Sequence, residues 1–286
     1  MPRGPKISII TPCFNSAKTI RETLQSVASQ DFRDWEHIVI DGASKDGTLE
    51  ILKEFPHLKV LSEKDDGHYD AMNKGIARTT GDYIVILNAD DCFLPGVLGK
   101  VVAALEKNPA WDGLFGDVIY VDVNSQEIYR RAEAKYDFNV LLYSLDNVCH
   151  HTLFVRREVY DRIGNYRQKD FRNAADFEFK LRLGHKGCRI GHLPEYIVNY
   201  RYHSAGQSAD RRITANSEAE AVRVRAEYGN PGGTRGEILR VVFKIKRQLQ
   251  KLFIRGSMDI IPGNVKLRSH MMDKAEFSSN SGLDKL

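Results

Sequence analysis

The stretch IVILNADD, residues 84–91, joins a run of large aliphatic residues to an asparagine and two adjacent carboxylates at its end. The aliphatic run is typical of a strand buried on both faces of a sheet. Neighbouring carboxylates repel, and each raises the pKa of the other unless a cation or hydrogen-bond donors compensate. Asp90 or Asp91 could cap a helix, since Pro95 follows closely, but a cap explains one aspartate better than two. The stretch therefore predicts a buried strand that ends in a functional site.

Strand and helix patterns alternate on both sides of this stretch. Strands are expected at residues 6–11, 36–40, 59–63 and 83–87. Helices are expected at 20–28 with Asn15 or Ser16 as the cap, at 48–55, at 70–81 with Gly81 closing the helix, and at 95–109. Connections this short predict a parallel α/β sheet covered on both faces.

The second part of the chain has a less regular pattern. Residues 116–122 are typical of a strand, and residues 175–187 of a helix that ends at Gly187. Residues 188–193 and 196–203 are typical of two strands near a sheet edge.

Length and composition indicate an ordinary α/β protein. The chain has 286 residues, of which 42% are hydrophobic and 28% charged, with a formal net charge of +4. This length allows one large domain or a domain with an appendage, and the charge is too slight to indicate a nucleic-acid partner. No stretch approaches the roughly 20 apolar residues that span a bilayer. The four cysteines lie far apart and form no C-x-x-C pair, so neither a zinc site nor a disulfide framework is expected. This cysteine usage predicts a cytoplasmic location.

Polar and acidic residues follow each of the first four expected strands. They are Thr11, Pro12 and Asn15; the stretch DGASKDGT (41–48); the stretch EKDDGHYDAMNK (63–74); and Asn88, Asp90 and Asp91. In open α/β sheets, ligands bind at the carboxyl ends of the strands. The G-x-G-x-x-G fingerprint and the P-loop motif are both absent. A phosphate-containing ligand would therefore be held with Mg²⁺ or Mn²⁺, which take carboxylate ligands.

Four blocks of sequence together resemble the family 2 glycosyltransferases of the nucleotide-diphospho-sugar (GT-A) fold. They are SIITPCFNSAKTIRETLQSVASQDF (8–32), IDGASKDGT (40–48), DDGHYDAMNKGIARTTGDYIVILNADD (65–91) and ADFEFKLRL (175–183). The resemblance extends over roughly residues 6–205 in the family's order. It implies a Rossmann-like mixed α/β sheet flanked by helices. It also implies an inverting, metal-assisted transfer of a sugar from a nucleotide donor, a UDP-sugar by resemblance, to a hydroxyl of a glycan or lipid-linked acceptor.

The resemblance places the donor nucleotide against the expected strand ends. Thr11, Pro12 and Asn15 would line the nucleoside, and Asp41 would accept a hydrogen bond from the base. The alternative for Asp41 is a turn-forming aspartate before a glycine.

Three polar residues on one expected helix are further candidates for binding the nucleotide sugar. Asp70, Asn73 and Lys74 lie at positions i, i+3 and i+4, so one helix face presents them together. They are expected to contact the nucleotide or its pyrophosphate. The alternative is a surface ion pair between Asp70 and Lys74, which contributes roughly a few tenths of a kcal/mol.

The family's D-x-D metal motif has an asparagine, Asn88, at its first position in this chain. Asn88 and Asp90 are expected to contact the nucleotide sugar, and Asp90 and Asp91 the divalent metal, Mn²⁺ or Mg²⁺. His203 matches a position that sometimes contributes a further metal or diphosphate contact, or is simply structural. The departure at Asn88 leaves single-ligand or weak metal binding as an alternative.

The block ADFEFKLRL carries the expected general base. Asp176 matches the family's acidic residue that accepts the proton of the acceptor hydroxyl, and a carboxylate suits that role. Its alternative is to cap the helix that follows. Glu178 is the weaker candidate, because it can face solvent one turn along. His150 and His151 fall on the acceptor side, where they would hydrogen-bond the acceptor or pack.

The C-terminal stretch EILRVVFKIKRQLQKLFIR (237–255) predicts an amphipathic helix. One face carries Ile238, Val241, Val242, Ile245, Leu249, Leu252 and Phe253, and the opposite face carries Arg240, Lys244, Arg247, Lys251 and Arg255. A basic amphipathic helix favours binding to a membrane surface, here its cytoplasmic face, where a lipid-linked acceptor would lie. The alternative is a helix that packs its apolar face on the domain and exposes its charges.

The expected organisation has two parts. A GT-A domain at residues 1–229 would divide into a nucleotide-sugar-binding half (6–125) and an acceptor-side half (126–229), and residues 230–286 would form the basic helix and a flexible tail.

Two other functions are alternatives to glycosyl transfer. A nucleotidyltransferase would usually carry a Gly-rich basic loop after the first strand, and TPCFNS is neither. A catalytically degenerate scaffold is favoured by Asn88 but not by Asp90, Asp91 and Asp176 together.

Overall fold

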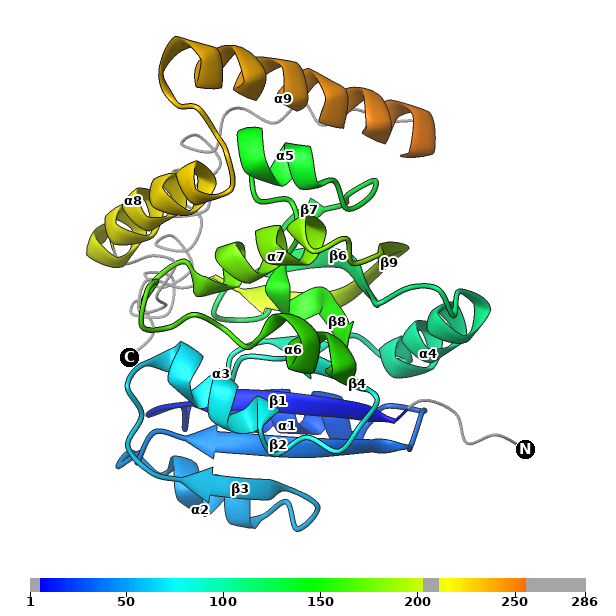
Figure 1. Cartoon of the computed structure of the whole chain (residues 1–286). Helices are drawn as coiled ribbons and strands as arrows, with labels where there is room; N and C mark the ends of the chain where they lie inside the picture. Colours follow the sequence, from blue (N-terminus) through cyan, green and yellow to red (C-terminus); the bar gives the residue numbers. More distant parts are fainter. Residues whose placement is uncertain (1–5, 203–210, 256–286) are drawn as a thin grey trace, which may run out of the picture.

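The structure is a computed structural model, and it describes residues 6–202 and 211–255 (Figure 1). Within these residues the strands form one nine-stranded mixed sheet, whose main path has the order β3-β2-β1-β4-β8-β6-β9-β5. Helices cover it, and the helices α8 and α9 follow at the C-terminal end of the described chain (Figure 1). This arrangement confirms the expected α/β class.

The first four strands of the chain form the parallel part of the sheet. They are β1 (Ile7–Cys13), β2 (Trp35–Asp41), β3 (Lys59–Ser62) and β4 (Tyr83–Ile86). Strand β1 lies between β2 and β4 and is parallel to both, and β3 adds to the outer side of β2. The carboxyl ends of β1, β2 and β4 therefore meet at one edge, as predicted.

The remaining strands make the sheet mixed rather than wholly parallel. They are β5 (Cys92–Phe93), β6 (Gly113–Val121), β7 (Glu127–Arg131), β8 (Leu153–Arg156) and β9 (Ile190–Arg201). Strand β8 is antiparallel to both β4 and β6, while β9 is parallel to β6. The expectation of a parallel sheet thus holds only for β1 to β4.

Strand β9 corrects the prediction of two separate strands at 188–193 and 196–203. The pairing with β6 skips from Leu193 to Tyr196, so Pro194 and Glu195 form a bulge inside one strand. Proline has no N–H to donate to the ladder, which explains the local break. The sequence pattern therefore located the interruption correctly, but the interruption is a bulge within one strand rather than a break between two strands.

The helices follow the predicted order with different ends. They are α1 (Ile20–Ala28), α2 (Thr48–Lys53), α3 (His68–Ile76), α4 (Val97–Lys107), α5 (Phe138–Tyr143), α6 (Arg157–Ile163), α7 (Ala175–His185), α8 (Arg211–Glu227) and α9 (Gly233–Arg255), with a 3-10 turn η1 at His150–Thr152. Helix α1 has Thr19 as its N-cap rather than Asn15 or Ser16. Helix α3 ends at Ile76, five residues before the predicted stop at Gly81. A Cβ at Gly81 would lie 2.6 Å from Ser8 Oγ, so this glycine allows a close approach to β1.

The two faces of the sheet bury separate clusters, because alternate residues of each strand point to opposite sides. Ile10 and Ile86 pack with Phe115 and Phe179 on the face covered by α3 and α7. Ile9 and Val85 pack with the apolar side of α1 and α4 on the other face. Coverage on both faces is therefore confirmed.

Helix α9 lies against α5 (Figure 1), and part of its basic side faces the body. Its inward side carries Arg247, which pairs with the buried Glu133, and Phe243, whose ring stacks on Tyr143 at 5.0 Å. Lys246 and Gln250 both reach Asp137, at 2.7 and 2.8 Å. The basic side that was expected to be solvated is thus partly buried, because the body supplies carboxylates beneath it.

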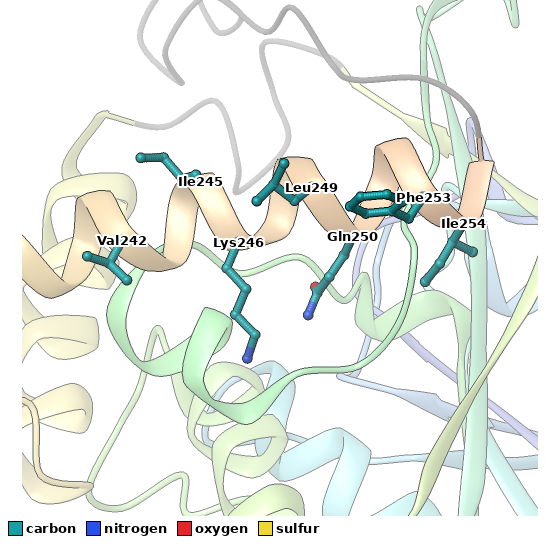
Figure 2. Close-up of a pocket in the computed structure, with 7 residues that line it drawn as sticks. All are labelled: Val242, Ile245, Lys246, Leu249, Gln250, Phe253 and Ile254. Atoms are coloured by element: carbon teal, nitrogen blue, oxygen red, sulfur yellow. The ribbon is translucent and has the colours of Figure 1, made fainter.

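The apolar side of α9 faces outward. The exposed large side chains of this helix are Ile238, Val241, Val242, Ile245, Leu249, Leu252, Phe253 and Ile254, and Phe253 is 83% exposed. Five of these side chains, together with Lys246 and Gln250, line an open groove of about 570 Å³ (Figure 2). Packing of this face on the domain, the alternative weighed above, is wrong. No helix within the described ranges is long and apolar enough to cross a membrane.

Candidate functional site

The candidate site lies at the carboxyl edge of the parallel strands. Cys13 at the end of β1 is in register with Asp41 at the end of β2, and Leu87 just beyond β4 donates its N–H to Ile10 O of β1. Asn88, Asp90 and Asp91 follow directly, so the sheet brings three of the predicted strand ends together. The 3-10 turn η1 and the first turn of α7 lie on the other side of the site.

Two of the residues expected to bind the nucleotide are fully buried. Thr11 points into the body, where its hydroxyl lies 2.9 Å from His37 Nε2. Asp41 accepts hydrogen bonds from Ser44 N at 3.1 Å and Ser62 Oγ at 2.6 Å, and it is fully buried. The bond from Ser44 N is the turn-forming contact that was the alternative for Asp41. Pro12, between them in β1, is also buried.

The loops after β1 and β2 hold each other through Asn15. Its backbone N–H donates to Ser44 Oγ at 2.8 Å, and its side-chain Oδ1 accepts from Lys45 N at 3.0 Å. Asn15 has a positive φ of 49°, which asparagine adopts more readily than most residues, whereas Ala43, with a φ of 62°, is strained. Such strained positions concentrate at functional sites.

Phe14 is a residue that the sequence analysis missed. It follows β1 directly and is 65% exposed, and its ring lies over Gly42, where an added Cβ would be 3.2 Å from Phe14 Cδ2. A large exposed aromatic ring between two polar loops is an obvious platform for a flat ligand. The only sequence signal was its position among polar residues at a strand end.

The three polar residues of α3 bind neighbouring segments of the chain. Lys74 Nζ pairs with Glu63, Asp65 and Asp70 at 2.9, 2.7 and 3.2 Å. The Asp70–Lys74 ion pair weighed as an alternative is therefore present, within a larger cluster.

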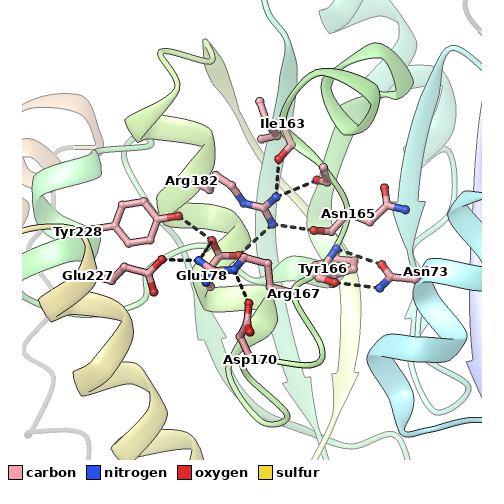
Figure 3. Close-up of polar contacts among 11 residues, drawn as sticks. Asn73, Ile163, Asn165, Tyr166, Arg167, Asp170, Glu178, Arg182, Glu227 and Tyr228 are labelled. Atoms are coloured by element: carbon pink, nitrogen blue, oxygen red, sulfur yellow. Dashed lines mark hydrogen bonds and ion pairs between the residues drawn. The ribbon is translucent and has the colours of Figure 1, made fainter.

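Asn73 joins α3 to the segment between α6 and α7. Its Nδ2 donates to Tyr166 O at 2.9 Å, and its Oδ1 accepts from Tyr166 N at 3.0 Å (Figure 3). Asp70 Oδ1 accepts from Gln168 Nε2 of the same segment at 2.9 Å. This face of α3 thus holds two loops in place beside the site.

Asp90 and Asp91 differ sharply in their surroundings. Asp91 is buried, with Oδ1 accepting from Arg201 N at 2.9 Å and Oδ2 lying 2.5 Å from His151 Nδ1. Burial raises the pKa of Asp91, and the neighbouring His151 opposes that shift. Asn88 and Asp90 are only half-buried. The repulsion between the two carboxylates is therefore offset on the protein side by His151 and a backbone N–H.

His151 and His150 form the opposite wall with their rings in contact. Their centroids are 3.7 Å apart at a near-perpendicular angle, and His151 also stacks on Tyr200 at 5.3 Å. Burial and the adjacent His151 hold the pKa of His150 well below its usual range, so the His150 ring is neutral. Its Nε2 is buried and has no hydrogen-bond partner within the described parts of the chain.

Asp176 lies in the first turn of α7, where its carboxylate is held at both oxygens. Tyr69 donates to Oδ1 at 2.6 Å, and Lys180 donates to Oδ2 at 2.9 Å. Burial by itself raises the pKa of Asp176, but Lys180, His150 and the bond from Tyr69 together hold that pKa well below its usual range. The N-cap of α7 is Ala174, so the capping alternative for Asp176 is wrong.

Glu178 does not face solvent, as the sequence analysis supposed. It is fully buried and accepts hydrogen bonds from Tyr228 Oη at 2.6 Å and Arg182 Nη2 at 2.9 Å (Figure 3). Arg182 also donates to the carbonyl oxygens of Ile163 and Asn165. Glu178 thus belongs to a network that fixes the end of α6 and the start of the next segment, away from the two aspartates at the strand edge.

The described residues supply few ligands for a metal. Among them no group of three or more His, Cys, Asp and Glu side chains could hold an ion. Mg²⁺ and Mn²⁺ are commonly bound by one or two carboxylates together with substrate phosphates. The half-buried Asp90 suits that arrangement, whereas Asp91 would first have to leave His151. His203 lies outside the described residues.

A sequence model of glycosyl transferase family 2 matches residues 8–164 of the chain. The chain is 34% identical over 185 residues to a PGL/p-HBAD biosynthesis glycosyltransferase of Mycobacterium bovis (strain BCG / Pasteur 1173P2), and the alignment covers 63% of this chain and 70% of the relative. It is 29% identical over 208 residues to the putative glycosyltransferase EpsE of Bacillus subtilis (strain 168). That alignment covers 70% of this chain and 74% of EpsE.

Among solved structures, the chain resembles S. aureus TarS 1–349 in complex with UDP-GlcNAc. The TM-score is 0.59 at 18% identity, and the match covers 97% of this chain and 92% of the TarS chain. At this identity the likeness concerns the fold, and it confirms the expected GT-A architecture.

Proposed function

Because the chain belongs to glycosyl transferase family 2, we propose that it transfers a sugar, with inversion, from a UDP-sugar to a hydroxyl of a glycan or lipid-linked acceptor. The observation that carries the proposal is the placement of Asp176. Its ionised carboxylate lies on the wall formed by η1 and α7, beside the strand edge that carries Asp90. A proton acceptor and a donor-binding edge are the two parts that the reaction requires.

Asp176 is proposed to act as the general base. The oxygen of the acceptor hydroxyl forms a bond to the anomeric carbon, and the bond from that carbon to the diphosphate oxygen breaks with its electron pair. The hydroxyl proton passes to Asp176, since the oxygen becomes acidic as its new bond forms. The low pKa of Asp176 keeps its carboxylate ionised.

The donor is proposed to bind across the ends of β1, β2 and β4. The complexes of TarS with UDP-GlcNAc and with UDP support a uridine nucleotide. Phe14 would stack on a flat ring of the donor, and Pro12 and Asn15 would shape the pocket. Asp41 would contact the base through the turn that it stabilises. Thr11, Asp70, Asn73 and Lys74 would support this pocket through their contacts with His37 and the neighbouring loops.

A divalent cation, Mg²⁺ or Mn²⁺, is proposed to accompany the donor. Such an ion neutralises charge on a departing diphosphate. Asp90 is the proposed ligand, with Asn88 beside it, and Asp91 would orient the turn through His151 and Arg201. A contact from His203 remains a proposal drawn from the sequence.

Helix α9 is proposed to rest on a membrane that presents a lipid-linked acceptor at its cytoplasmic face. The outward row of aliphatic side chains supports this proposal, and the exposed Arg235, Arg240 and Lys244 lie on the same helix. Each cation near an anionic lipid surface contributes about 1 kcal/mol.

The donor proposal is tested by thermal unfolding with a panel of nucleotide sugars, with and without Mn²⁺. A donor at about 100 times its dissociation constant adds roughly 2.7 kcal/mol and raises the midpoint by several degrees. We expect a Mn²⁺-dependent rise with UDP-sugars that is lost in Asp90→Ala and kept in Asp170→Ala, a matched change at an exposed position. A well-folded protein that responds to no donor would contradict the proposal.

A further inference from the structure

Lys180 is a buried cation that the reaction as described does not use. It lies one turn after Asp176 on α7 and is 1% exposed. Its Nζ donates to Asp176 Oδ2 at 2.9 Å, to Asp146 Oδ2 at 2.5 Å and to Val148 O at 3.1 Å. An ammonium group has three hydrogens, so each has an acceptor.

Two of these acceptors belong to a different part of the chain. Asp146 and Val148 lie between α5 and η1, just before His150 and His151. His151 contacts Asp91, and His150 Nδ1 lies 3.6 Å from Asp176 Oδ2. One ammonium group therefore joins the carboxylate of α7 to the segment that carries both histidines.

Stability alone does not explain this arrangement. A buried ion pair often contributes no more than a well-packed apolar residue of similar size, because both ions lose their hydration. Lys180 lies in the buried part of α7, where its neighbours Phe179 and Leu181 are fully buried. A methionine would be of similar length, yet would leave Asp176 with Tyr69 as its remaining strong donor.

We infer that Lys180 is a positioning residue for glycosyl transfer: its ammonium fixes the Asp176 carboxylate relative to residues 146–151 and keeps that carboxylate ionised. The inference rests on the proposed role of Asp176 as the base. Lys180 does not touch the substrate in this account; it acts through Asp176 and the segment before His150.

The pH dependence follows from the groups around Asp176. They are Tyr69 and His68 on α3, Lys180 on α7, His150 on η1 and Tyr166 before α7. Lys180 is the positively charged group of this set that hydrogen-bonds the carboxylate. An opposite charge at this distance lowers a carboxyl pKa by about 1–3 units. Removal of Lys180 should therefore raise the pKa of Asp176 by a similar amount.

The test measures UDP release from UDP-GlcNAc, or from whichever UDP-sugar stabilises the protein, between pH 4 and pH 8. A base must be ionised, so the rate falls as pH falls through its pKa. The wild type should show no acidic limb from Asp176 in this range, because the pKa of Asp176 lies well below its usual value. In Lys180→Met the burial that raises this pKa is no longer opposed by the ammonium, so we expect an acidic limb to enter the range from below and kcat to fall by tenfold or more, with KM for the donor unchanged. Lys180→Arg should show no such limb, because the charge is retained.

Lys186→Met is the matched control, since it removes one positive charge at the exposed end of the same helix. It should leave both the pH profile and kcat as in the wild type. Lys180→Gln, which keeps N–H donors but no charge, replaces the methionine variant if that protein does not fold. A pH profile that coincides with that of the wild type in Lys180→Met or Lys180→Gln would overturn the inference.

Asp176→Asn separates this failure from failure of the proposed function. If that variant is inactive while the Lys180 variants keep the wild-type profile, only the inference is wrong. If Asp176→Asn retains wild-type activity, or if the wild type releases no UDP, both the inference and the proposed base are wrong.

Discussion

Asp176 combines features that rarely occur together in a proton acceptor. Its carboxylate is nearly buried, takes hydrogen bonds at both oxygens and has a pKa held well below its usual range. A carboxylate with a very low pKa is an intrinsically weak base, so its contribution to catalysis depends on its position relative to the acceptor hydroxyl. Tyr69 and Lys180 supply that position from two different helices.

We predict that Asp176→Asn lowers kcat for sugar transfer by about 10²–10⁴. The amide is of similar size and keeps one oxygen that can accept from Tyr69 or from Lys180, but it cannot take up a proton. Initial rates of UDP release, measured at saturating donor, give the comparison. Asp170→Asn, an exposed change in the preceding segment, should remain within about twofold of the wild type. Equal rates in the two variants would refute the assignment.

Individual residues at the strand ends could be predicted by type but not by partner. Short polar stretches after aliphatic runs are local features, so Asp41, Asp90 and Asp91 could be placed at one edge from the sequence. Tyr69 and Asp176 are separated by 107 positions, and nothing in their local sequence links them. The same holds for Arg201, whose N–H reaches Asp91 across 110 positions.

At the level of elements, α9 shows what a periodic pattern can and cannot define. A helical wheel separates the apolar side from the basic side, and that division is correct. Which side faces the body depends on Glu133 and Asp137, more than 100 residues earlier, which attract Arg247 and Lys246. The orientation of α9 on the body could therefore not be derived from the helix sequence alone.

We predict that the outward row of α9 binds lipid vesicles. In sedimentation with vesicles containing anionic lipid, Ile245→Ser combined with Leu249→Ser should weaken binding by at least about tenfold. Each buried aliphatic side chain contributes about 1.5–3 kcal/mol, and 1.4 kcal/mol corresponds to tenfold. Val123→Ser combined with Val222→Ser removes exposed valines from other elements and should leave binding unchanged.

Several outcomes would contradict the membrane proposal. If the wild type does not sediment with vesicles but elutes as a dimer that the serine variant abolishes, the row is an interface between copies of the chain. If a chain ending at residue 255 binds and the full chain does not, residues 256–286 cover the row instead.

For the molecule as a whole, buried neutral histidines make stability depend on pH. Burial lowers the pKa of His37 to about 3, whereas the unfolded residue titrates near 6.5. Between these values the unfolded chain binds a proton that the native state does not. Stability should therefore fall as pH decreases from about 6.5 toward about 3, with a contribution from His37 of up to about 1.4 kcal/mol per pH unit.

The measurement is denaturant unfolding of the wild type and His37→Gln at intervals between pH 4.5 and pH 8. The glutamine does not titrate, so the free energy of unfolding of the variant should fall less steeply below pH 6. Above pH 7 the two curves should run parallel, because His37 is neutral in both states there. Parallel curves over the whole range would show that His37 is not the source.

The sequence predicted one part of the architecture, the parallel strands, but not the antiparallel part. Strand-helix alternation predicted the parallel strands β1 to β4 and their common edge. The antiparallel placement of β8 between β4 and β6 was not visible, because short apolar runs carry no information about direction. His150 and His151, proposed for the acceptor side, directly precede β8, so its pairing brings them to the site.

The paired bonds between Asn73 and Tyr166 bear on which substitutions the chain tolerates. With one donor and one acceptor at the same reach, the side-chain amide imitates a peptide group and forms a one-residue ladder with the backbone of Tyr166. Aspartate lacks the donor, leucine lacks both groups, and glutamine is one methylene too long. Variation at position 73 should therefore be as restricted as at a reacting residue, although the constraint is one of shape and imitation rather than chemistry.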